Sequence, residues 1–564
     1  MKLTRRNFLL GSAIATASVA TARQSVFAKS GIFTNLASGN PLKIPPVISG
    51  GNLTLAVGKS EIFPGVQTDV YTINGSYPAP MIRIKKGEQF SAHITNNLTG
   101  DCVLHWHGFH LPAVMDGHPK YAIAPGQSTD ITFPIINRAG TYFYHAHTDM
   151  RTAEQVYRGI AGMFIVDDDE DTALPLPRGI YDVPLMISDK HFDDNKQLSY
   201  QPNATDLLGG FLGETILVNG TVDAYHSVAP TLYRFRVLNN SNARTYKIAL
   251  SNDASFTVIG TDGGLIEKPV SVKSCFLAPA ERLDILVDFS TYQNGTEITL
   301  KSISFFYDGP HSSSSVIEGA ELNILRFDVS TTGTSGAQIP TALSTIVAYK
   351  EADALRKRQF TLFHSGSMHM INGLSFSMDR IDYTIPFGEL EIWEFLNSTT
   401  EIHPMHIHGL QFQVLDRSSS SVLFTNDLGW KDTVMVAGGD TVRVLVKFDT
   451  YEGLFLLHCH NLEHEDHGMM QNILITKQNG VVEEKPSETQ FQISPNPARE
   501  MTTVFVAPVN SPRELLLTTI TGVPIFQQII DAGASSAILR LSGISSGKYI
   551  VSIDGLTTLL NVIQ

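Results

Sequence analysis

The chain is poor in cysteine, in tryptophan and in charge. It has three Cys and three Trp among 564 residues, and 17% of its residues are charged. Three cysteines cannot supply the disulfide framework of a small, loop-rich secreted domain. Basic residues are also scarce, with 41 Lys and Arg against 55 Asp and Glu and a net charge of −14 at pH 7. This balance argues against nucleic acid or an anionic membrane as the main partner.

Long hydrophobic runs are missing as well, so we expect no membrane span. The first 28 residues form a separate segment with the pair Arg5-Arg6, a mild apolar run and the small-residue end Val26-Phe27-Ala28. This segment resembles a twin-arginine export signal, and the alternative is a short N-terminal anchor. We therefore expect export by machinery that carries folded proteins, to the periplasm, the cell surface or the medium.

The body of the chain has the pattern of an all-β protein. Short alternating runs recur between Gly, Pro, Asn and Asp, and no long stretch has a helical period. A unit of three parts occurs three times: a strand ending on Asn, a turn and a second alternating strand. The first strands and the turns are Gln89–Asn97 with Ala124–Gln127, Tyr233–Asn240 with Ala278–Glu281, and Leu390–Asn397 with Ala437–Asp440. The repeat predicts three β-sandwich domains at 45–167, 180–330 and 355–477, with a linker at Ser330–Gly336.

The last part of the chain, 486–564, differs in composition and has no His. We expect a small separate β-sandwich there. It resembles the C-terminal sorting domain of type IX secretion substrates in its Pro495-Asn496-Pro497 opening and its Gly547-Lys548-Tyr549 strand. The alternative is a small domain that binds another partner or a surface.

Most of the 19 histidines fall into four clusters. Side chains alternate between the two faces of a strand, so a His-x-His pair puts both imidazoles on one face. Imidazole favours copper, zinc, iron or nickel. The clustered residues are His105 and His107; His145 and His147; His403, His406 and His408; and His458, His460 and His464.

Cys459 makes copper the favoured metal. Alternation turns it to the face opposite His458 and His460, where it can join His403, His464 and a weak axial Met469. That set is typical of a blue-copper electron-transfer site. The backbone also gives a short covalent path from the Cys459 sulfur to either neighbouring imidazole. Zinc is the alternative, but zinc needs no electron path and the sequence has no Cys-x-x-Cys.

The four clusters match the four copper signatures of the multicopper oxidases. The segments 429–434 (Gly-Trp-Lys-Asp-Thr-Val) and 461–470 (Asn-Leu-Glu-His-Glu-Asp-His-Gly-Met-Met) resemble the bacterial branch of laccases, bilirubin oxidases and cuprous oxidases. The resemblance covers about 45–477. It implies an all-β fold of three cupredoxin-like Greek-key sandwiches, followed here by the small C-terminal β domain.

The resemblance also implies four copper ions and their ligands. The type 1 copper takes His403, Cys459, His464 and Met469, with Met470 as a rival axial ligand. The type 2 copper takes His105 and His406. The type 3 pair takes His107, His145, His147, His408, His458 and His460. Every ligand position is filled, which argues against relatives that keep the fold but have lost copper. One chain carries the whole set, so a monomer can close the trinuclear cluster.

The implied activity is the four-electron reduction of dioxygen to water, driven by one-electron oxidation of a donor at the type 1 copper. Two acids are expected to relay protons to the oxygen site, Asp116 in the first loop and Glu465 beside His464. The alternative for each is an ordinary solvated or salt-bridged carboxylate.

The reductant is less constrained by the sequence. Cuprous oxidases of this branch carry a Met-rich segment, since thioethers suit Cu(I), but Gln338–Phe363 contains no Met. This favours a phenol, an aromatic amine or a bilirubin-like pigment, with Glu401 as a contact for the substrate proton. Three alternatives remain open: a cuprous oxidase in copper resistance, a non-enzymatic copper-binding or electron-transfer protein, and an envelope scaffold. Cys102 and Cys275 match no copper motif and are expected as buried thiols, or as a disulfide between the first two domains.

Overall fold

The computed structural model describes residues 39–477, 491–494, 498–506, 509, 511–519, 523–553 and 556–563. The predicted export signal, 1–28, and the segment 495–497 lie outside these residues. A short unit ends at Asn40, and all that follows lies in the compact unit Pro41–Gln564. Among the described residues, no helix has the length and hydropathy needed to cross a membrane.

The first sandwich packs a four-stranded sheet on a five-stranded one. The order of the first sheet is β4 (Val66–Ile73), β3 (Gly51–Phe63), β6 (Gln89–Asn97), β8 (Ser128–Pro134). The order of the second is β2 (Val47–Ile48), β5 (Met81–Lys85), β10 (Ala161–Asp167), β9 (Gly140–Ala146), β7 (Leu104–His107). Buried side chains of both sheets, among them Leu55, Phe90 and Trp106, form one core.

The second sandwich packs a seven-stranded sheet against a further sheet. The order of the first is β13 (Thr221–Val222), β12 (Thr215–Val218), β11 (Asp182–Lys190), β15 (Leu232–Asn239), β20 (Arg282–Asp288), β17 (Phe256–Thr261), β18 (Gly264–Val272). The other contains β14 (Ala224–Val228), β22 (Leu322–Val329), β21 (Glu297–Ser302), β16 (Tyr246–Leu250), β19 (Ser274–Leu277).

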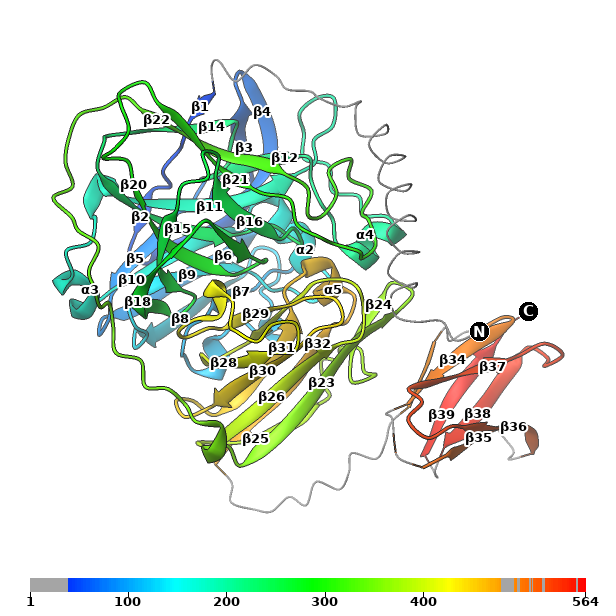
Figure 1. Cartoon of the computed structure of the whole chain (residues 1–564). Coiled ribbons are helices and arrows are strands. Elements are labelled where there is room, and N and C mark those ends of the chain that lie inside the picture. The colour runs from blue at the N-terminus through cyan, green and yellow to red at the C-terminus, as the bar shows by residue number, and fades with distance from the viewer. Residues whose placement is uncertain are drawn as a thin grey trace, which may run out of the picture. The chain divides into compact units, whose positions relative to one another are not determined.

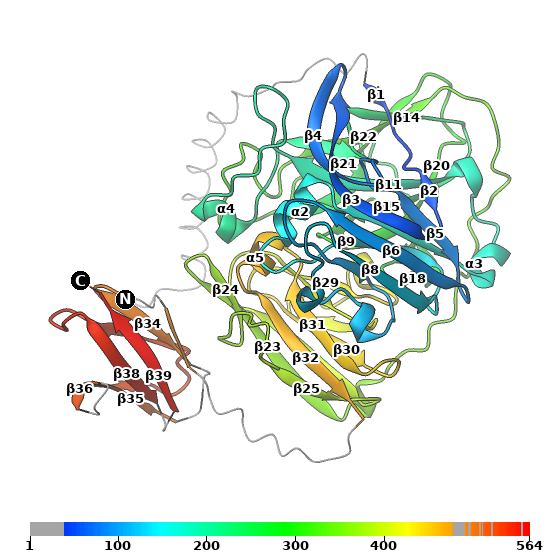
Figure 2. The ribbon, with the colours of Figure 1, turned by 180° about the vertical axis from the view of Figure 1, so that it is seen from behind.

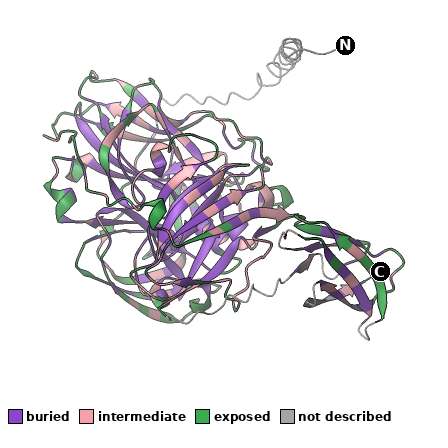
Figure 3. Cartoon of the chain, turned by 60° about the horizontal axis from the view of Figure 1, so that its bottom comes forward, coloured by how far each residue is buried: buried purple, intermediate pink, exposed green. Residues whose placement is uncertain are grey.

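The third sandwich has two five-stranded sheets. Their orders are β24 (Met368–Ile371), β23 (Arg356–Ser365), β26 (Leu390–Asn397), β30 (Thr441–Lys447), β28 (Gln413–Arg417), and β25 (Tyr383–Pro386), β32 (Met470–Thr476), β31 (Gly453–Cys459), β27 (His403–Ile407), β29 (Thr433–Val436). Strand residues that face the cores are buried, and exposed residues lie in loops and on the outer faces of some strands (Figure 3).

The C-terminal residues form two further sheets over a separate core. One contains β33 (Gln492–Ser494), β34 (Met501–Phe505), β37 (Ser536–Arg540), and the other β36 (Pro524–Ile530), β35 (Arg513–Thr519), β38 (Gly547–Ile553), β39 (Leu556–Val562). The core includes Leu517, Leu539 and Val551. The all-β prediction is therefore confirmed.

The predicted repeat corresponds to the same strand pair in each sandwich: β6 with β8, β15 with β20, and β26 with β30, all antiparallel. An Asn near the end of each first strand has the same role. The side-chain oxygens of Asn96, Asn239 and Asn397 each accept a hydrogen bond from the backbone N–H two residues on, at 2.9–3.0 Å. Their side-chain amides donate to backbone carbonyls of other segments of the chain. Short polar side chains of this kind hold a turn by such bonds, which is why Asn recurs at this position.

The helices among the described residues are short. They are α2 (Thr152–Arg158), α3 (Asp169–Ala173), α4 (Ala204–Gly209) and α5 (Leu462–Asp466), with 3₁₀ turns η1 (Ala113–Met115), η2 (Pro119–Tyr121), η3 (Gly179–Tyr181), η4 (Glu351–Asp353) and η5 (Thr425–Asp427). Helix α5, directly after β31, contacts α2 of the first sandwich and α4 of the second (Figures 1 and 2). The end of β31 therefore lies where all three sandwiches come together.

Candidate metal centre

Four strands carry the histidine clusters, two from the first sandwich and two from the third. In β7 and β9, His105 lies opposite His145, and in β27 and β31, His406 lies opposite His458. Residues opposite each other in a sheet share a face. Each sheet therefore presents its own imidazoles on one face.

The two faces meet in a buried cluster. The Nε2 atoms of His105 and His406 are 3.3 Å apart, and those of His147 and His458 are 3.2 Å apart. Every one of the eight clustered imidazoles here is at most 4% exposed. The nitrogens form three sets of three: His105, His107 and His406; His107, His145 and His460; and His147, His408 and His458. The first two sets share His107.

Hydrogen bonds on the outer side of the rings fix their orientation. The Nδ1 atoms of His105 and His406 donate to the backbone oxygens of Asp116 and Asp432, at 2.6 and 2.8 Å. His408 Nδ1 donates to the Asp116 carboxylate at 2.7 Å. These three rings therefore direct an unprotonated Nε2 inward. His107 is reversed: its Nε2 lies 3.0 Å from the Asp432 carboxylate, and its Nδ1 has no hydrogen-bond partner.

This arrangement fits metal ions. Burial first, and the neighbouring imidazoles second, hold the pKa of His107, His147, His406 and His408 well below the usual value, so the rings are neutral. Unprotonated nitrogens that face each other at about 3 Å repel unless a cation lies between them. Two nitrogens at about 2.0 Å from one tetrahedral metal are themselves about 3.3 Å apart.

A second set lies on the opposite face of β31. Cys459 Sγ is 3.5 Å from His403 Nδ1 and 3.7 Å from His464 Nδ1, and the two nitrogens are 3.1 Å apart. The backbone N–H of Met469 donates to the His464 oxygen, and that of Cys459 to the Met469 oxygen. Met469 is thus tied to both neighbouring residues.

Met470, the rival axial residue, lies on the other face. It is opposite His458 in the pairing of β31 with β32. Because opposite residues share a face, Met470 points with His458 towards the histidine cluster rather than with Cys459. The strand register therefore favours Met469 over Met470 as the axial residue of the set that contains Cys459.

The two predicted acids lie against the cluster. Besides His408, Asp116 has a carboxylate oxygen 3.4 Å from His105 Nδ1. Glu465 has one oxygen 3.0 Å from His458 Nδ1 and the other 3.7 Å from His147 Nε2. Both acids are nearly completely buried, so neither is an ordinary solvated carboxylate.

Comparison with known proteins identifies the family to which the chain belongs. Family models described as multicopper oxidase match residues 56–171, 182–296 and 344–479. A laccase of Bacillus stratosphericus is 32% identical over 466 residues, which cover 72% of this chain and 90% of that protein. The chain belongs to the multicopper oxidase family. Membership implies copper binding, and the histidine sets above fit it.

Two further matches are informative. The crystal structure of the McoA multicopper oxidase of Aquifex aeolicus is 39% identical, with a TM-score of 0.71, over 78% of this chain and 100% of that one. The cell division protein FtsP of Escherichia coli K12 is 32% identical over 494 residues, which cover 84% of this chain and 99% of that protein. Both an oxidase and a protein named for cell division are therefore among the relatives.

In this multicopper oxidase the second sandwich covers Cys459, His403 and His464, which we call the Cys459 set. Both its imidazoles are fully buried, and His464 Nε2 donates to the Leu208 oxygen at 2.8 Å. Beside it, His364 Nε2 lies 3.2 Å from Glu401. Burial raises the pKa of Glu401, but hydrogen bonds from His364 and Thr399 outweigh burial and lower the pKa to about 2.

Several residues near the centre were not assigned a role from the sequence. Asp432 belongs to the motif 429–434, yet its contact with His107 depends on the packing of the first sandwich on the third. Arg282 and His369 follow no motif. Cys102 and Cys275, in contrast, are both free and buried, as expected for thiols without a metal role.

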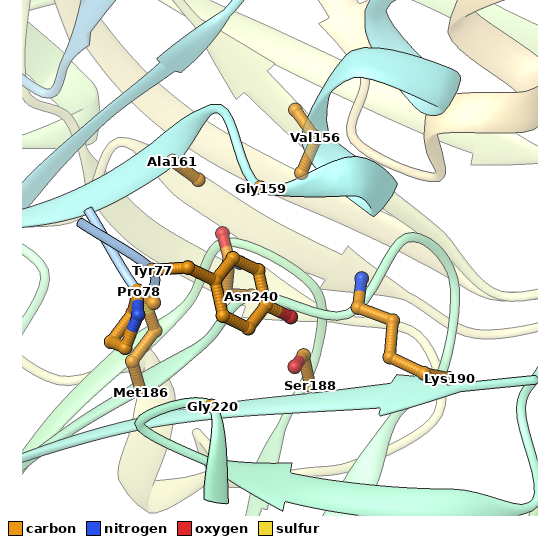
Figure 4. Close-up of a pocket in the computed structure, with 10 residues that line it drawn as sticks. All are labelled: Tyr77, Pro78, Val156, Gly159, Ala161, Met186, Ser188, Lys190, Gly220 and Asn240. Carbon is orange, nitrogen blue, oxygen red and sulfur yellow. The ribbon is translucent and has the colours of Figure 1, made fainter. Parts of the chain in front are cut away.

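A small pocket lies between the first and second sandwiches, lined by Tyr77, Met186, Ser188 and Lys190 among others (Figure 4). Lys190 is 2% exposed and its Nζ has no hydrogen-bond partner. The ammonium lies 4.2 Å from the centre of the Tyr157 ring, and burial lowers its pKa to about 8. The free volume, about 10 Å³, has room for about one water molecule.

Proposed function

We propose that this multicopper oxidase couples one-electron oxidation of a phenolic or related aromatic donor to four-electron reduction of dioxygen to water. One observation carries the proposal. Cys459, in the Cys-His set, stands directly between His458 and His460, which belong to two different three-nitrogen sets. An electron arriving at the sulfur has a short covalent path to both.

The proposed ligands are those of the family pattern. His403, Cys459, His464 and Met469 hold the type 1 copper, and His105 and His406 hold type 2. Each type 3 copper takes three imidazoles, one from His107, His145 and His460, the other from His147, His408 and His458. The total is four coppers in one chain, so a monomer suffices. When bound, copper supplies the redox chemistry, and the protein supplies orientation and protons.

Asp116 and Glu465 are proposed to deliver the protons that reduction of dioxygen consumes. Each carboxylate is buried and lies against an outer ring nitrogen of the cluster. From there a carboxylic acid can pass a proton to the reacting site through a water molecule, which general acid catalysis allows.

The proposed donor is aromatic because the cover of the Cys459 set holds few thioether ligands. Among the residues near this set that the structure describes, Met368 is 37% exposed, while Met370 is fully buried. His364 is partly exposed and its contact with Glu401 raises the pKa of its imidazole, so this pair can accept, at His364, the proton that a phenol releases on oxidation. These features support a laccase-like donor over Cu(I).

Two other functions remain as alternatives. A cuprous oxidase would use the same centre with Cu(I) as donor. A scaffold role is supported by the similarity to FtsP over 84% of the chain. However, a scaffold would not need the complete set of proposed copper ligands.

The test is dioxygen uptake by copper-loaded protein, with a phenol and with Cu(I) in parallel, and with C459S as control. Fast uptake with the phenol that C459S abolishes is the expected result. Uptake with Cu(I) alone would favour the cuprous oxidase. A copper-loaded protein that consumes no dioxygen with either donor would favour the scaffold.

We also propose export by the twin-arginine-type signal and sorting by the C-terminal domain, with the mature protein in the periplasm, on the surface or secreted. Fractionation of cells expressing the full chain and a chain ending at Lys477 tests this. Equal distribution of the two forms would contradict the sorting role.

A further inference from the structure

The second sandwich supplies none of the proposed copper ligands, yet one of its side chains reaches the histidine cluster. Arg282 is the first residue of β20, directly after the Ala278–Glu281 turn. It is fully buried. A buried guanidinium needs several acceptors to offset the cost of removing it from water.

Arg282 finds its acceptors in all three sandwiches. Its Nε donates to the Thr141 oxygen of the first at 3.0 Å, and Nη1 to the Ala280 oxygen of the second at 2.6 Å. Nη1 also donates to Asp432 Oδ1 of the third at 2.8 Å, and Nη2 donates to Asp432 Oδ2. The last two bonds form a bidentate pair, the geometry that fixes a carboxylate most firmly.

Asp432, held in this way, faces His107. Its Oδ1 is 3.0 Å from His107 Nε2, and Thr433 Oγ1 lies 3.1 Å from the same nitrogen. An ionised carboxylate only accepts hydrogen bonds, so Nε2 carries the proton. Nδ1 is then left unprotonated, buried and without a partner. His107 is also the residue that two of the three-nitrogen sets share.

The glycine after His107 makes room for this pair. A Cβ at Gly108 would overlap Asp432 Oδ2 and would lie 3.2 Å from Arg282 Nη2. The φ angle of Gly108 is also +84°, a conformation that other residues rarely adopt. The Arg282–Asp432 pair and the positive φ angle therefore both favour glycine at position 108, directly after His107.

We infer that Arg282 is a positioning residue for the trinuclear site: through Asp432 it selects the tautomer of His107 in which Nδ1 faces the metal. The second sandwich thus takes part in assembling the site although it binds no copper. The inference rests on the proposed metal centre, and it concerns one ligand of that centre rather than the donor or the reaction.

The experiment compares R282Q and R282K with the parent holoenzyme, using copper per chain, the near-ultraviolet band of the oxidised type 3 pair, and the blue thiolate–copper band. Arg282 does not contact the Cys459 set, so the blue band serves as an internal reference. Loss of such a supporting contact lowers metal affinity by about 10–100-fold. We expect R282Q to lose type 3 copper and the near-ultraviolet band while the blue band stays, and R282K to restore part of both.

R236Q is the matched control. Arg236 is equally buried in the second sandwich and pairs with Asp182 at 2.8 Å, which also accepts from Arg83 of the first sandwich. It touches no predicted ligand. We expect R236Q to lower the melting temperature and to keep both bands. The inference is overturned if R282Q keeps its type 3 copper, or if R236Q loses it to the same extent.

Failure of this inference and failure of the proposed function give different results. A parent protein that binds no copper would overturn the metal centre itself. A parent with four coppers and an R282Q variant indistinguishable from it would overturn only the role of Arg282.

Discussion

The imidazole of His369 stacks on that of His464, with ring centroids 3.8 Å apart and planes 20° apart. The two rings also make parallel hydrogen bonds to consecutive residues of α4, His369 Nε2 to the Leu207 oxygen and His464 Nε2 to the Leu208 oxygen. A helix of the second sandwich and a strand of the third together shield the Cys459 set from solvent.

This stacking predicts an effect on redox potential. Solvent access and the surroundings of a metal tune its potential. In H369A, water gains access to His464, which favours the more highly charged oxidised copper, so the potential of the type 1 site should fall. H369F retains a ring against His464 and should change the potential less. Redox titration followed by the blue band measures this.

The control for that series is H226F, since His226 lies in β14 of the second sandwich, in a different sheet from β24. It should leave the potential unchanged. Equal potentials in the parent, H369A and H369F would show that the stacked ring does not shield the site.

Two of the three cysteines, Cys459 and Cys275, are predicted to respond differently to substitution. C459S should lose the blue band and one of four coppers, because the thiolate is the strongest ligand of its set. C275S should keep all four, because Cys275 is buried without any metal-ligand partner. C275S should lower the free energy of unfolding by about 1–3 kcal/mol, because the substitution buries a hydroxyl in an apolar site. Copper analysis and absorption spectra check both variants, and loss of copper in C275S would contradict the assignment.

Candidate ligands can be predicted from the sequence, but the residues that position them cannot. His-x-His spacing and strand alternation are local, so they predict that His105 and His107 share one face of a strand, as do His458 and His460. Arg282 and Asp432 are 150 residues apart and meet only when three sandwiches pack. No local pattern marks such a pair. The strand predicted as Tyr233–Asn240 runs from Leu232 to Asn239, a one-residue offset at each end.

Stability should depend on pH through Glu318, a buried acid of the second sandwich. One of its oxygens accepts from the Thr245 N–H at 2.8 Å, and the other has no hydrogen-bond partner. Burial, only partly offset by Arg244, raises its pKa to about 7 in the folded protein. A raised folded pKa means that folding favours the protonated acid, so this contribution to stability is present below the unfolded pKa, near 4.3, and is lost as pH rises through 7.

E318Q removes that titration. Relative to the parent, its melting temperature should therefore rise between about pH 5 and pH 8. The exposed Glu321, three residues further on, provides the control E321Q. Thermal unfolding at the two pH values measures the difference. A constant offset between E318Q and the parent would contradict the raised pKa.

The two buried acids should act on the oxygen half of the reaction alone. Asp116 Oδ2 accepts from His408 Nδ1, whereas the bond from His105 Nδ1 goes to the backbone oxygen of Asp116 and survives substitution. D116N therefore keeps its copper but cannot donate a carboxylic proton, and general acid catalysis is worth about 10²–10⁴-fold. We expect reoxidation by dioxygen to slow by about that factor, while anaerobic reduction of the blue band by a phenol keeps the parent rate.

E465Q should behave in the same way, and D130N, a substitution of an exposed acid on β8, should match the parent. Stopped-flow measurement of the two half-reactions separates these outcomes, and a D116N variant slowed equally in both halves would show a disturbed site rather than a missing proton.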